Sequence, residues 1–282
     1  MKALVVGAGG QLGRALLRTT PAGAELVAFD RTELDITDRA AVERTIGESG
    51  ADIVFNAAAY TAVDKAESEI DRARAINAEG VGYLATAAKA HGALFVHVST
   101  DFVFSGDAGT PYTPETQTNP LGVYGLTKLE GEKAAGEESL IVRTAWIYDR
   151  DGQNFVNTML RLMDERDMLS VVADQIGTPT LADDLAVALW KLAEAGETGV
   201  LHCTNSGVAS WYDFAVAIQD EAVAAGRLAR AIPVSPIRTV DYPTPARRPH
   251  YSVLDCSETY KRVGEPARHW RVGLRHVFNR AE

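Results

Sequence analysis

Short apolar runs alternate with longer amphipathic stretches through the first half of the chain. The apolar runs cover residues 3–6, 25–29, 52–55, 93–98 and 140–144, and helical patterns lie between them at 14–19, 39–49, 66–91 and 124–138. Strands that alternate with helices predict βαβ units around a parallel sheet buried on both faces. With right-handed crossovers, the predicted fold class is α/β, a doubly wound parallel sheet of the Rossmann type.

The pattern changes after about residue 145. Residues 153–165 and 181–195 carry amphipathic helical patterns, and short apolar runs occur at 169–172 and 200–202. Prolines crowd the segment 233–249, which predicts that this segment is mostly loop. We therefore expect one domain over 1–145 and a smaller α/β domain over 146–282, some of whose elements can return to the sheet.

A glycine-rich turn follows the first predicted strand and leads into the first predicted helix. Gly7, Gly10 and Gly13 have the spacing G-x-x-G-x-x-G. The first glycine makes a tight turn, the second lets the backbone approach a pyrophosphate, and the third lets helix and strand pack closely. The helix N-terminus adds free N–H groups and a partial positive charge. The turn predicts dinucleotide binding by residues 1–145, which leaves 146–282 mainly for substrate.

The end of the second predicted strand bears on which dinucleotide is bound. Asp30 can accept hydrogen bonds from the ribose hydroxyls of NAD(H), whereas Arg31 can pair with the 2′-phosphate of NADP(H). Each can also be a solvated charge of the turn, so the choice between NADH and NADPH stays open. Asp35 and Ile36 follow and can flank the adenine, with Asp38 as a helix N-cap beside them.

A second group of residues suits the reduction of a carbonyl. Tyr124 and Lys128 are four positions apart and therefore share one face of a helix. Thr100 follows the strand over 93–98, at the sheet edge where ligands of open α/β sheets bind. A lysine ammonium beside the phenol is expected to lower the tyrosine pKa, and the threonine can donate a hydrogen bond to the carbonyl oxygen. These three residues are the candidate catalytic set.

The composition and net charge of the chain disfavour several classes of binding partner. The chain has 282 residues, 46% of them hydrophobic and 23% charged, as in ordinary globular proteins. A net charge of −10 disfavours nucleic acid and anionic membranes as partners. Two cysteines are too few for a disulfide framework or a thiolate metal site. An apolar strand follows Met1-Lys2 directly, without a signal-peptide pattern, and we expect a cytoplasmic protein.

Several motifs resemble the extended short-chain dehydrogenase/reductase family, and within it the reductases of dTDP-linked 4-dehydrorhamnose. The likeness covers nearly the whole chain, and its two middle motifs are far more specific than a lone Tyr-x-x-x-Lys. The matching stretches are GAGGQLG at 7–13, NAAAYTAVDKAE at 56–67, STDFVFSG at 99–106, VYGLTKLEGE at 123–132, RTAWIY at 143–148, DQIGTPT at 174–180 and YPTPARRP at 242–249. The resemblance implies NAD(P)H-dependent reduction of the C4 ketone of dTDP-4-dehydro-β-L-rhamnose to dTDP-L-rhamnose.

The resemblance also implies roles for individual residues. Tyr124 would donate the proton, and Tyr124 and Lys128 would also contact the cofactor. The other cofactor contacts would come from Gly7, Gly10, Gln11, Leu12, Gly13, Asp30, Arg31, Asp35, Ile36, Ala57, Ala58, Ala59, Tyr60 and Thr61. Thr100, Asp101, Trp146 and Arg247 would bind the sugar nucleotide, although Trp146 can instead be a core residue. Arg247 and Arg248 can pair with the nucleotide diphosphate or be solvated loop charges.

Two departures from the family pattern change the expectations. Some members dimerise around Mg²⁺ through a glutamate soon after the glycine turn, but this chain has Arg14-Ala15. We therefore expect no metal, and a monomer or weak homodimer. Phe102 replaces the usual tyrosine after Thr-Asp, so a hydroxyl contact to the ligand is absent.

Three alternative functions remain open from sequence. A dehydratase of the same family would carry Asp-Glu after the threonine, whereas Asp101 is followed by Phe102. A reductase of another dTDP-4-keto-6-deoxyhexose would differ only in its pocket. A non-catalytic regulatory subunit on the same fold would not need the complete set of Thr100, Tyr124 and Lys128.

Overall fold

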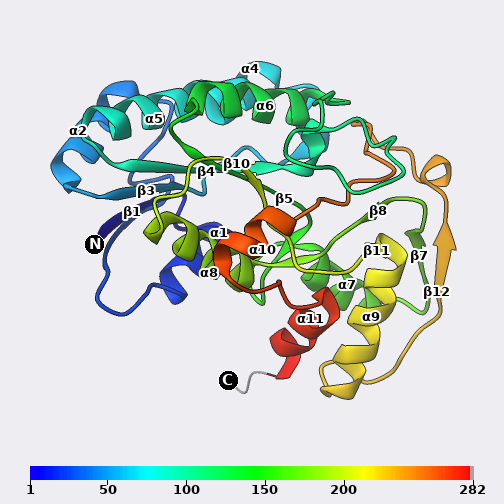
Figure 1. The fold of residues 1–282 in the computed structure, drawn as a ribbon. Helices are drawn as coiled ribbons and strands as arrows, with labels where there is room; N and C mark the ends of the chain where they lie inside the picture. Colours follow the sequence, from blue (N-terminus) through cyan, green and yellow to red (C-terminus); the bar gives the residue numbers. More distant parts are fainter. Residues whose placement is uncertain (280–282) are drawn as a thin grey trace.

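A six-stranded parallel sheet forms the centre of the computed structural model, which describes residues 1–279 (Figure 1). Its strand order is β10-β5-β4-β3-β1-β2, so the chain reverses direction across the sheet at β1. The strands are β1 (Lys2–Val6), β2 (Glu25–Phe29), β3 (Ile53–Asn56), β4 (Leu94–Thr100), β5 (Leu140–Thr144) and β10 (Gly199–His202). Ligands of open α/β sheets bind outside the carboxyl ends of the strands near such a reversal.

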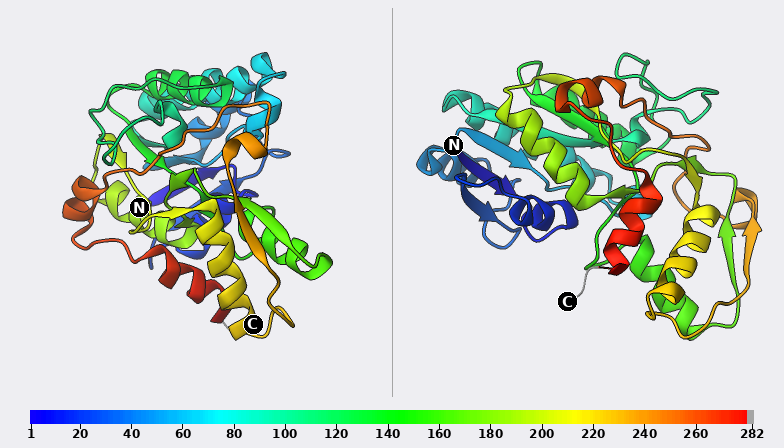
Figure 2. Two further views of the ribbon diagram at one scale, coloured as in Figure 1. Left: turned by 90° about the vertical axis from the view of Figure 1, so that its right-hand side faces the viewer. Right: turned by 60° about the horizontal axis from the view of Figure 1, so that its bottom comes forward.

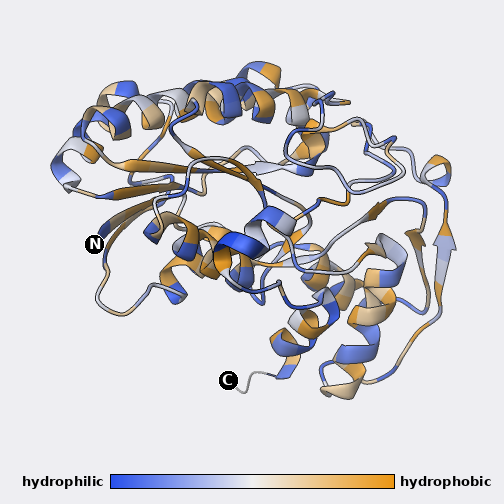
Figure 3. Cartoon of the chain, in the orientation of Figure 1, coloured by the Kyte–Doolittle hydropathy of each residue, from blue (hydrophilic) through white to orange (hydrophobic). Residues whose placement is uncertain are grey.

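Helices cover both faces of this sheet, which confirms the predicted doubly wound architecture (Figures 1 and 2). One face is covered by α1 (Gln11–Arg18) and α8 (Ala182–Glu194), whose residues Leu16, Leu189 and Trp190 are fully buried against the strands. The other face is covered by α2 (Arg39–Ser49), α5 (Gly80–Ala90) and α6 (Val123–Ala135). The strands are the most continuously apolar part of the fold (Figure 3), as burial on both faces requires.

The predicted helix over 66–91 is wrong in its details. The structure has α3 (Val63–Ala66), α4 (Ile70–Arg74), a π-helical turn η1 (Ala75–Glu79) and then α5. The turn holds buried Asn77, whose side chain bonds the backbone N–H and C=O of Tyr60 and the hydroxyl of Thr127. These tertiary bonds compensate the irregular turn, and π turns of this kind occur often beside functional sites.

Three two-stranded sheets and several helices form a second lobe beside the carboxyl ends of the main strands (Figure 2). The sheets pair β6 with β9, β7 with β12, and β8 with β11. Its core contains Tyr148, Phe214 and Trp270. The elements of this lobe are β6 (Ile147–Tyr148), α7 (Phe155–Glu165), β7 (Leu169–Val172), β8 (Ile176–Gly177), β9 (Thr180–Leu181), β11 (Ala209–Ser210), α9 (Trp211–Ala224), β12 (Val234–Ile237) and α11 (Trp270–Asn279). Helix α10 (Ser257–Val263) packs instead against α8 and β10 of the main sheet.

The proline-rich segment 233–249 is more ordered than the sequence predicts. Strand β12 occupies its beginning and contains Pro236, and a 3₁₀ turn η3 (Thr239–Asp241) follows. A proline can stand in β12 because this strand pairs only with β7 and leaves its other edge free, so its missing N–H breaks no second ladder. In residues 1–279 no helix is long and apolar enough to cross a membrane.

Candidate active site

A cavity of about 590 Å³ lies at the carboxyl ends of β3, β4 and β5. Asn56, Thr100 and Thr144 are the last residues of these strands and line it. The glycine turn, α6 and the second lobe close its other sides, through Gly10, Tyr124, Lys128, Trp146, Trp211 and Arg248 among others. The predicted catalytic residues Thr100, Tyr124 and Lys128 therefore come together where the topology places a ligand.

The glycine turn has the geometry that a bound diphosphate requires. Gly7 has φ +82°, in the left-handed region, and a Cβ on Gly13 would overlap the Gly7 carbonyl oxygen. Gly10 is the N-cap of α1 and no side chain caps this helix, so the N–H groups of its first turn are free. Gly10, Gln11 and Leu12 line the cavity. These donors fit the phosphates of a dinucleotide.

A second cavity, of about 370 Å³, continues from the first across the glycine turn, because both are lined by Gly9, Gly10 and residues 57–59. Its walls are Gly7, Asp30, Arg31, Thr32, Leu34, Asp35, Ile36 and Ile76. The backbone and side chain of Thr32 donate to the Asp30 carboxylate and hold the pKa of this group below its usual value. The arrangement fits an adenosine, with Asp30 and Arg31 both within the cavity wall.

Residues 57–61 separate into lining and supporting positions. Ala57, Ala58 and Ala59 line both cavities, and Thr61 lines the larger one. Tyr60 lines neither of these cavities: its ring is buried and its hydroxyl donates to Glu69 at 3.1 Å. Asp38 caps α2 by accepting from the N–H of Ala41, the local role considered from sequence.

Tyr124 and Thr100 meet inside the larger cavity. The half-buried Tyr124 ring packs edge-on against Phe102, with the ring centres 5.4 Å apart. Burial raises the pKa of Tyr124 to about 12, against a smaller lowering by its hydrogen bond with Thr100. The expected lowering of this pKa by Lys128 is therefore wrong for this structure. The phenol stays protonated at neutral pH, which is the form that donates a proton.

Lys128 is 2% exposed and lies one helical turn after Tyr124, on the same face of α6. Its Nζ donates to the Val98 carbonyl at 2.7 Å and contacts His97 Nε2 at 3.3 Å. Burial lowers the pKa of Lys128 to about 8, although the Glu132 carboxylate opposes the shift. These contacts direct the amine toward β4, and the Tyr124 pKa is set by burial, Thr100 and Asp101.

Glycines let α6 approach the turn after β4 and the π-helical turn η1 closely. A Cβ on Gly125 would overlap the Phe102 carbonyl oxygen, and a Cβ on Gly131 would overlap the Asn77 carbonyl oxygen. Glycine inside a helix costs about 1 kcal/mol relative to alanine, so the close approach has to be stabilised by packing. A sequence pattern indicates this close approach, because a glycine beside Tyr124 inside a helical pattern is typical of a close backbone contact.

Asp101 is buried at the edge of the cavity. The carboxylate accepts from the Thr100 hydroxyl at 2.9 Å, and its side chain is 2% exposed. Burial raises the pKa of Asp101 to about 6, while hydrogen bonds from Ser252 and Thr100 oppose the shift. A carboxylate that is ionised in such a place weakens the fold and is available to bind a polar ligand.

We expect Asp101→Asn to stabilise the protein at pH 7.5. The folded-state pKa exceeds that of the unfolded chain, so stability is lost as pH rises between about 4 and 6, and the loss amounts to about 3 kcal/mol at neutral pH. The amide removes this loss. Thermal unfolding should show a gain for the variant at pH 7.5 that disappears below pH 4, and none for the exposed Asp107→Asn. An equal gain at both pH values would contradict the assignment.

Trp146 is positioned by a strained backbone. It has φ +48°, the one non-glycine residue of 1–279 with positive φ, and its ring stacks on Trp211 of α9. A Cβ on Gly177 would overlap the Trp146 ring, so β8 also packs close to it. The side chain is half-buried: it lines the cavity and also packs against the core of the second lobe, so both roles considered from sequence apply. Such strain marks residues whose position is set by the surrounding structure.

The two arginines of the loop after η3 differ in placement. Arg247 is exposed and does not line the cavity. Arg248 lines it and pairs with Asp64 through two hydrogen bonds of 3.1 and 2.8 Å. The ion pair joins this loop to α3. Of the two arginines, Arg248 is therefore the one that can contact a ligand in the cavity.

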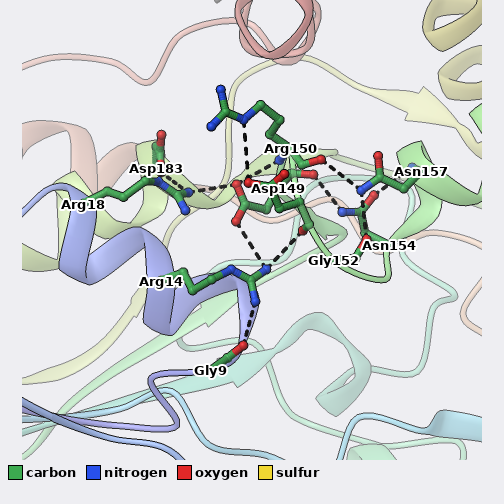
Figure 4. Close-up of polar contacts among 10 residues, drawn as sticks. Gly9, Arg14, Arg18, Asp149, Arg150, Gly152, Asn154, Asn157 and Asp183 are labelled. Carbon is green, nitrogen blue, oxygen red and sulfur yellow. Dashed lines mark hydrogen bonds and ion pairs between the residues drawn. The ribbon is translucent and has the colours of Figure 1, made fainter. Parts of the chain in front are cut away.

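A cluster of charged residues connects the glycine turn to the second lobe (Figure 4). Arg14 donates to the Gly9 carbonyl at 2.6 Å and the Asp151 carbonyl at 3.1 Å. Arg18 pairs with Asp149 at 2.8 Å, and also with Asp183 of α8. From sequence, Arg14 is notable only as part of the Arg14-Ala15 pair that lacks the family's glutamate, and its contacts to the second lobe are not apparent. Among residues 1–279, no three His, Cys, Asp or Glu side chains are grouped so that they could hold a metal.

Known proteins resemble this chain over its whole length. The family model described as the RmlD substrate binding domain matches residues 1–282. A dTDP-4-dehydrorhamnose reductase of Aggregatibacter actinomycetemcomitans is 44% identical over 290 residues, covering 99% of each chain. A solved dTDP-4-dehydrorhamnose reductase of Clostridium acetobutylicum has a TM-score of 0.93 at 42% identity and covers 99% of both chains. One of Bacillus anthracis, solved in complex with NADP, has a TM-score of 0.92 at 37% identity over 98% of both chains.

Proposed function

This chain belongs to the RmlD substrate binding domain family, and on that premise we propose how its own residues bind and reduce the substrate. The reaction is the NAD(P)H-dependent reduction of the C4 ketone of dTDP-4-dehydro-β-L-rhamnose to dTDP-L-rhamnose. The observation that supports the assignment of roles is the meeting of Thr100, Tyr124 and Lys128 in one cavity with the glycine turn.

The glycine turn and the residues beside it bind the cofactor. Gly10, Gln11 and Leu12 offer backbone donors to the diphosphate, and Gly7 and Gly13 shape the turn. Asp30 and Arg31 contact the adenosine ribose, with Asp35 and Ile36 beside the adenine. Ala57, Ala58, Ala59 and Thr61 form the opposite wall, and Tyr60 supports them from beneath through Asn77. When bound, the reduced nicotinamide supplies the hydride to C4.

Tyr124 supplies the proton. As hydride reaches C4, negative charge develops on the carbonyl oxygen, and the protonated phenol of Tyr124 donates to it. Thr100 donates a hydrogen bond to the same oxygen, and this requires its hydroxyl to turn away from Asp101. Lys128 as an ammonium stabilises the phenolate that remains and contacts the nicotinamide ribose. The alkaline limit of the reaction then follows Lys128 rather than Tyr124, because its pKa of about 8 is the lower of the two.

Residues 146–282 contribute mainly to substrate binding. Trp146, held by its stack on Trp211, and Asp101 face the sugar nucleotide. Of the two arginines that the sequence offers for the nucleotide diphosphate, Arg248 fits this role better than Arg247 because it lines the cavity. The domain boundary near residue 145 is functional rather than structural, since β10 and α8 from the second half complete the main sheet and its cover.

Arg31→Ala is expected to weaken NADPH binding more than NADH binding. A charged hydrogen bond to the 2′-phosphate would be lost, which corresponds to roughly a tenfold or larger increase in the NADPH Kd. NADH has no group there, and its Kd should be nearly unchanged. Fluorescence titration of both cofactors measures the two ratios. Equal losses would show that Arg31 does not touch the 2′-phosphate, and Arg39→Ala, on α2, serves as the control for loss of an exposed arginine.

We further propose a monomer or weak homodimer in the cytoplasm, without a metal. Nucleotide-linked sugars and reduced nicotinamide cofactors are intracellular metabolites, and Cys203 and Cys256 are both free and buried, as in a reducing compartment. Arg14 is committed to contacts within the chain and offers no metal ligand.

The proposal is tested by cofactor oxidation with a substrate panel. Purified protein is mixed with NADH or NADPH and enzymatically made dTDP-4-dehydrorhamnose, and in parallel with another 4-keto-6-deoxy sugar nucleotide. We expect oxidation with the first substrate to exceed that with the second by at least one order of magnitude, and to persist in EDTA. A preference for the second sugar would reassign the substrate. Absence of turnover with both, at retained cofactor binding, would favour a non-catalytic role.

A further inference from the structure

His97 is a buried titratable side chain that the proposed reaction does not use. It lies on β4, is fully buried, and its register partner on β3 is Asn56. One ring nitrogen, Nδ1, lies 3.1 Å from Asn56 Nδ2, and the other, Nε2, lies 3.3 Å from Lys128 Nζ. Three side chains on β3, β4 and α6 therefore form a chain that ends at a residue of the candidate catalytic set.

The direction of each hydrogen bond in this chain follows from its first member. The N–H of Ala58 can only donate, and it lies 3.1 Å from the side-chain oxygen of Asn56. The other atom of the Asn56 amide is therefore the NH₂ group, which can only donate, and His97 Nδ1 must accept from it. Burial and the charge of Lys128 hold the pKa of His97 well below its usual value, so the ring is neutral. A neutral ring with an accepting Nδ1 carries its proton on Nε2.

That proton points at the Lys128 amine. A neutral amine can accept it, whereas an ammonium would place one N–H group against another. The ammonium is therefore favoured only when Nζ moves away from His97 and into the cavity. In the proposed function, Tyr124 and the cofactor ribose lie there.

We propose that Asn56 and His97 are positioning residues: Asn56 fixes the His97 tautomer, and His97 Nε2–H holds the neutral Lys128 amine and directs the ammonium into the cavity. This inference rests on the proposed role of Lys128 toward the cofactor. Of these two residues, Asn56 lines the cavity and His97 does not.

Other charged groups around α6 bear on the same titration. Glu132 lies one turn after Lys128 and favours the ammonium, but its carboxylate is itself shared by Ser99 at 2.5 Å and a bidentate Arg143 at 2.9 and 2.7 Å. Other titratable groups on these elements include Tyr124 on α6, Asp101 after β4, Glu67 bound at the Val123 N–H, and Arg74 paired with Glu130. None of these reaches His97 by a hydrogen bond among the described residues, so His97 acts on Lys128 separately from them.

The tautomer can be read in the wild-type protein. In a ¹⁵N-histidine spectrum between pH 5.5 and 9, two buried histidines should stay neutral, because burial lowers the pKa values of both His97 and His202. His202 Nδ1 faces the Tyr112 carbonyl at 3.0 Å and must donate, so His202 carries its proton on Nδ1. We expect one buried histidine of each tautomer. Two Nδ1–H tautomers would overturn the proposal, whatever the activity of the protein.

Variants test the effect on Lys128 through NADPH binding rather than turnover. The wild-type Kd for NADPH should rise above about pH 8, as Lys128 loses its proton. His97→Gln can turn an amide oxygen toward the ammonium, and Asn56→Asp reverses the tautomer so that Nε2 accepts. Each should move the rise in Kd upward by about one pH unit, the shift that one ordinary hydrogen bond produces.

His202→Gln is the matched control, because it removes a buried histidine of the same sheet that does not face Lys128. Its pH dependence should follow the wild type. An unshifted rise in both His97→Gln and Asn56→Asp, or an equal shift in His202→Gln, would overturn the proposal. If the variants do not fold, the wild-type tautomer spectrum decides alone. A wild-type protein that does not bind NADPH at any pH would instead contradict the proposed function.

Discussion

Tyr124→Phe is expected to reduce turnover by roughly 10²–10⁴-fold, the usual worth of a positioned general acid. The change removes only the phenol oxygen, so the edge-on packing of the ring on Phe102 is kept. The Kd of NADPH and the KM of the sugar nucleotide should therefore change by much less than kcat. Steady-state kinetics with varied cofactor and substrate separate these quantities.

Tyr60→Phe provides a matched control. This tyrosine is also buried near the site, but its hydroxyl donates to Glu69 and does not line either cavity. Its loss should leave kcat within a few-fold of wild type. If Tyr124→Phe also kept near-wild-type turnover, another acid would have to serve. Asp101 would be the first candidate, because its pKa of about 6 leaves part of it protonated near neutral pH.

Gly10→Val is expected to abolish cofactor binding while the protein stays folded. Gly10 has φ −75°, an ordinary value for any residue, and a Cβ there would be 3.3 Å from the Gly7 carbonyl oxygen, which is tight but possible. The valine side chain would stand over the free N–H groups of α1, where the diphosphate has to approach. Quenching of NADPH fluorescence should be lost, and circular dichroism should be unchanged.

Gly109→Val serves as the control, because a Cβ on Gly109 meets no atom within 4 Å and this glycine lies outside the cavities. It should bind NADPH as the wild type does. By contrast, Gly13→Val would be uninformative, since a Cβ there overlaps backbone atoms and would unfold the turn. Retained NADPH binding by a folded Gly10→Val protein would contradict the assignment of the glycine turn to the diphosphate.

Local patterns were enough to predict five strands of the sheet and to bring the candidate catalytic residues to one edge of it, while β10 was expected in the second domain. Buried parallel strands are continuous apolar runs, and residues such as Val54 and Val142 mark them without ambiguity. The glycine turn, Thr100 and the Tyr124–Lys128 spacing each depend on a few neighbouring residues, and the order of strands brings them to one edge. The helix over 66–91 was mistaken because its π turn is stabilised by the contacts of Asn77 to distant residues, which no local pattern reveals.

The electrostatics of the site could not be predicted in the same way. The pKa values of Tyr124 and Lys128 depend on burial and on where the amine points, and the sequence gives neither quantity. His97 faces Asn56 because of the register between β3 and β4, which is set by the whole sheet. Arg14 was known only as a departure from a family pattern, although its contacts join the glycine turn to a loop more than a hundred residues away (Figure 4).

Transfer of deuterium is the most direct test of the central claim, that this chain delivers hydride to C4 of the sugar nucleotide and a proton to its oxygen. NADPH deuterated at C4 of the nicotinamide is incubated with dTDP-4-dehydrorhamnose and the purified protein, and the product is examined by NMR and mass spectrometry. We predict dTDP-L-rhamnose with deuterium at C4 of the sugar, formed from one of the two C4 epimers of the labelled cofactor. A product without deuterium at C4, or cofactor oxidation without a reduced sugar, would contradict the account.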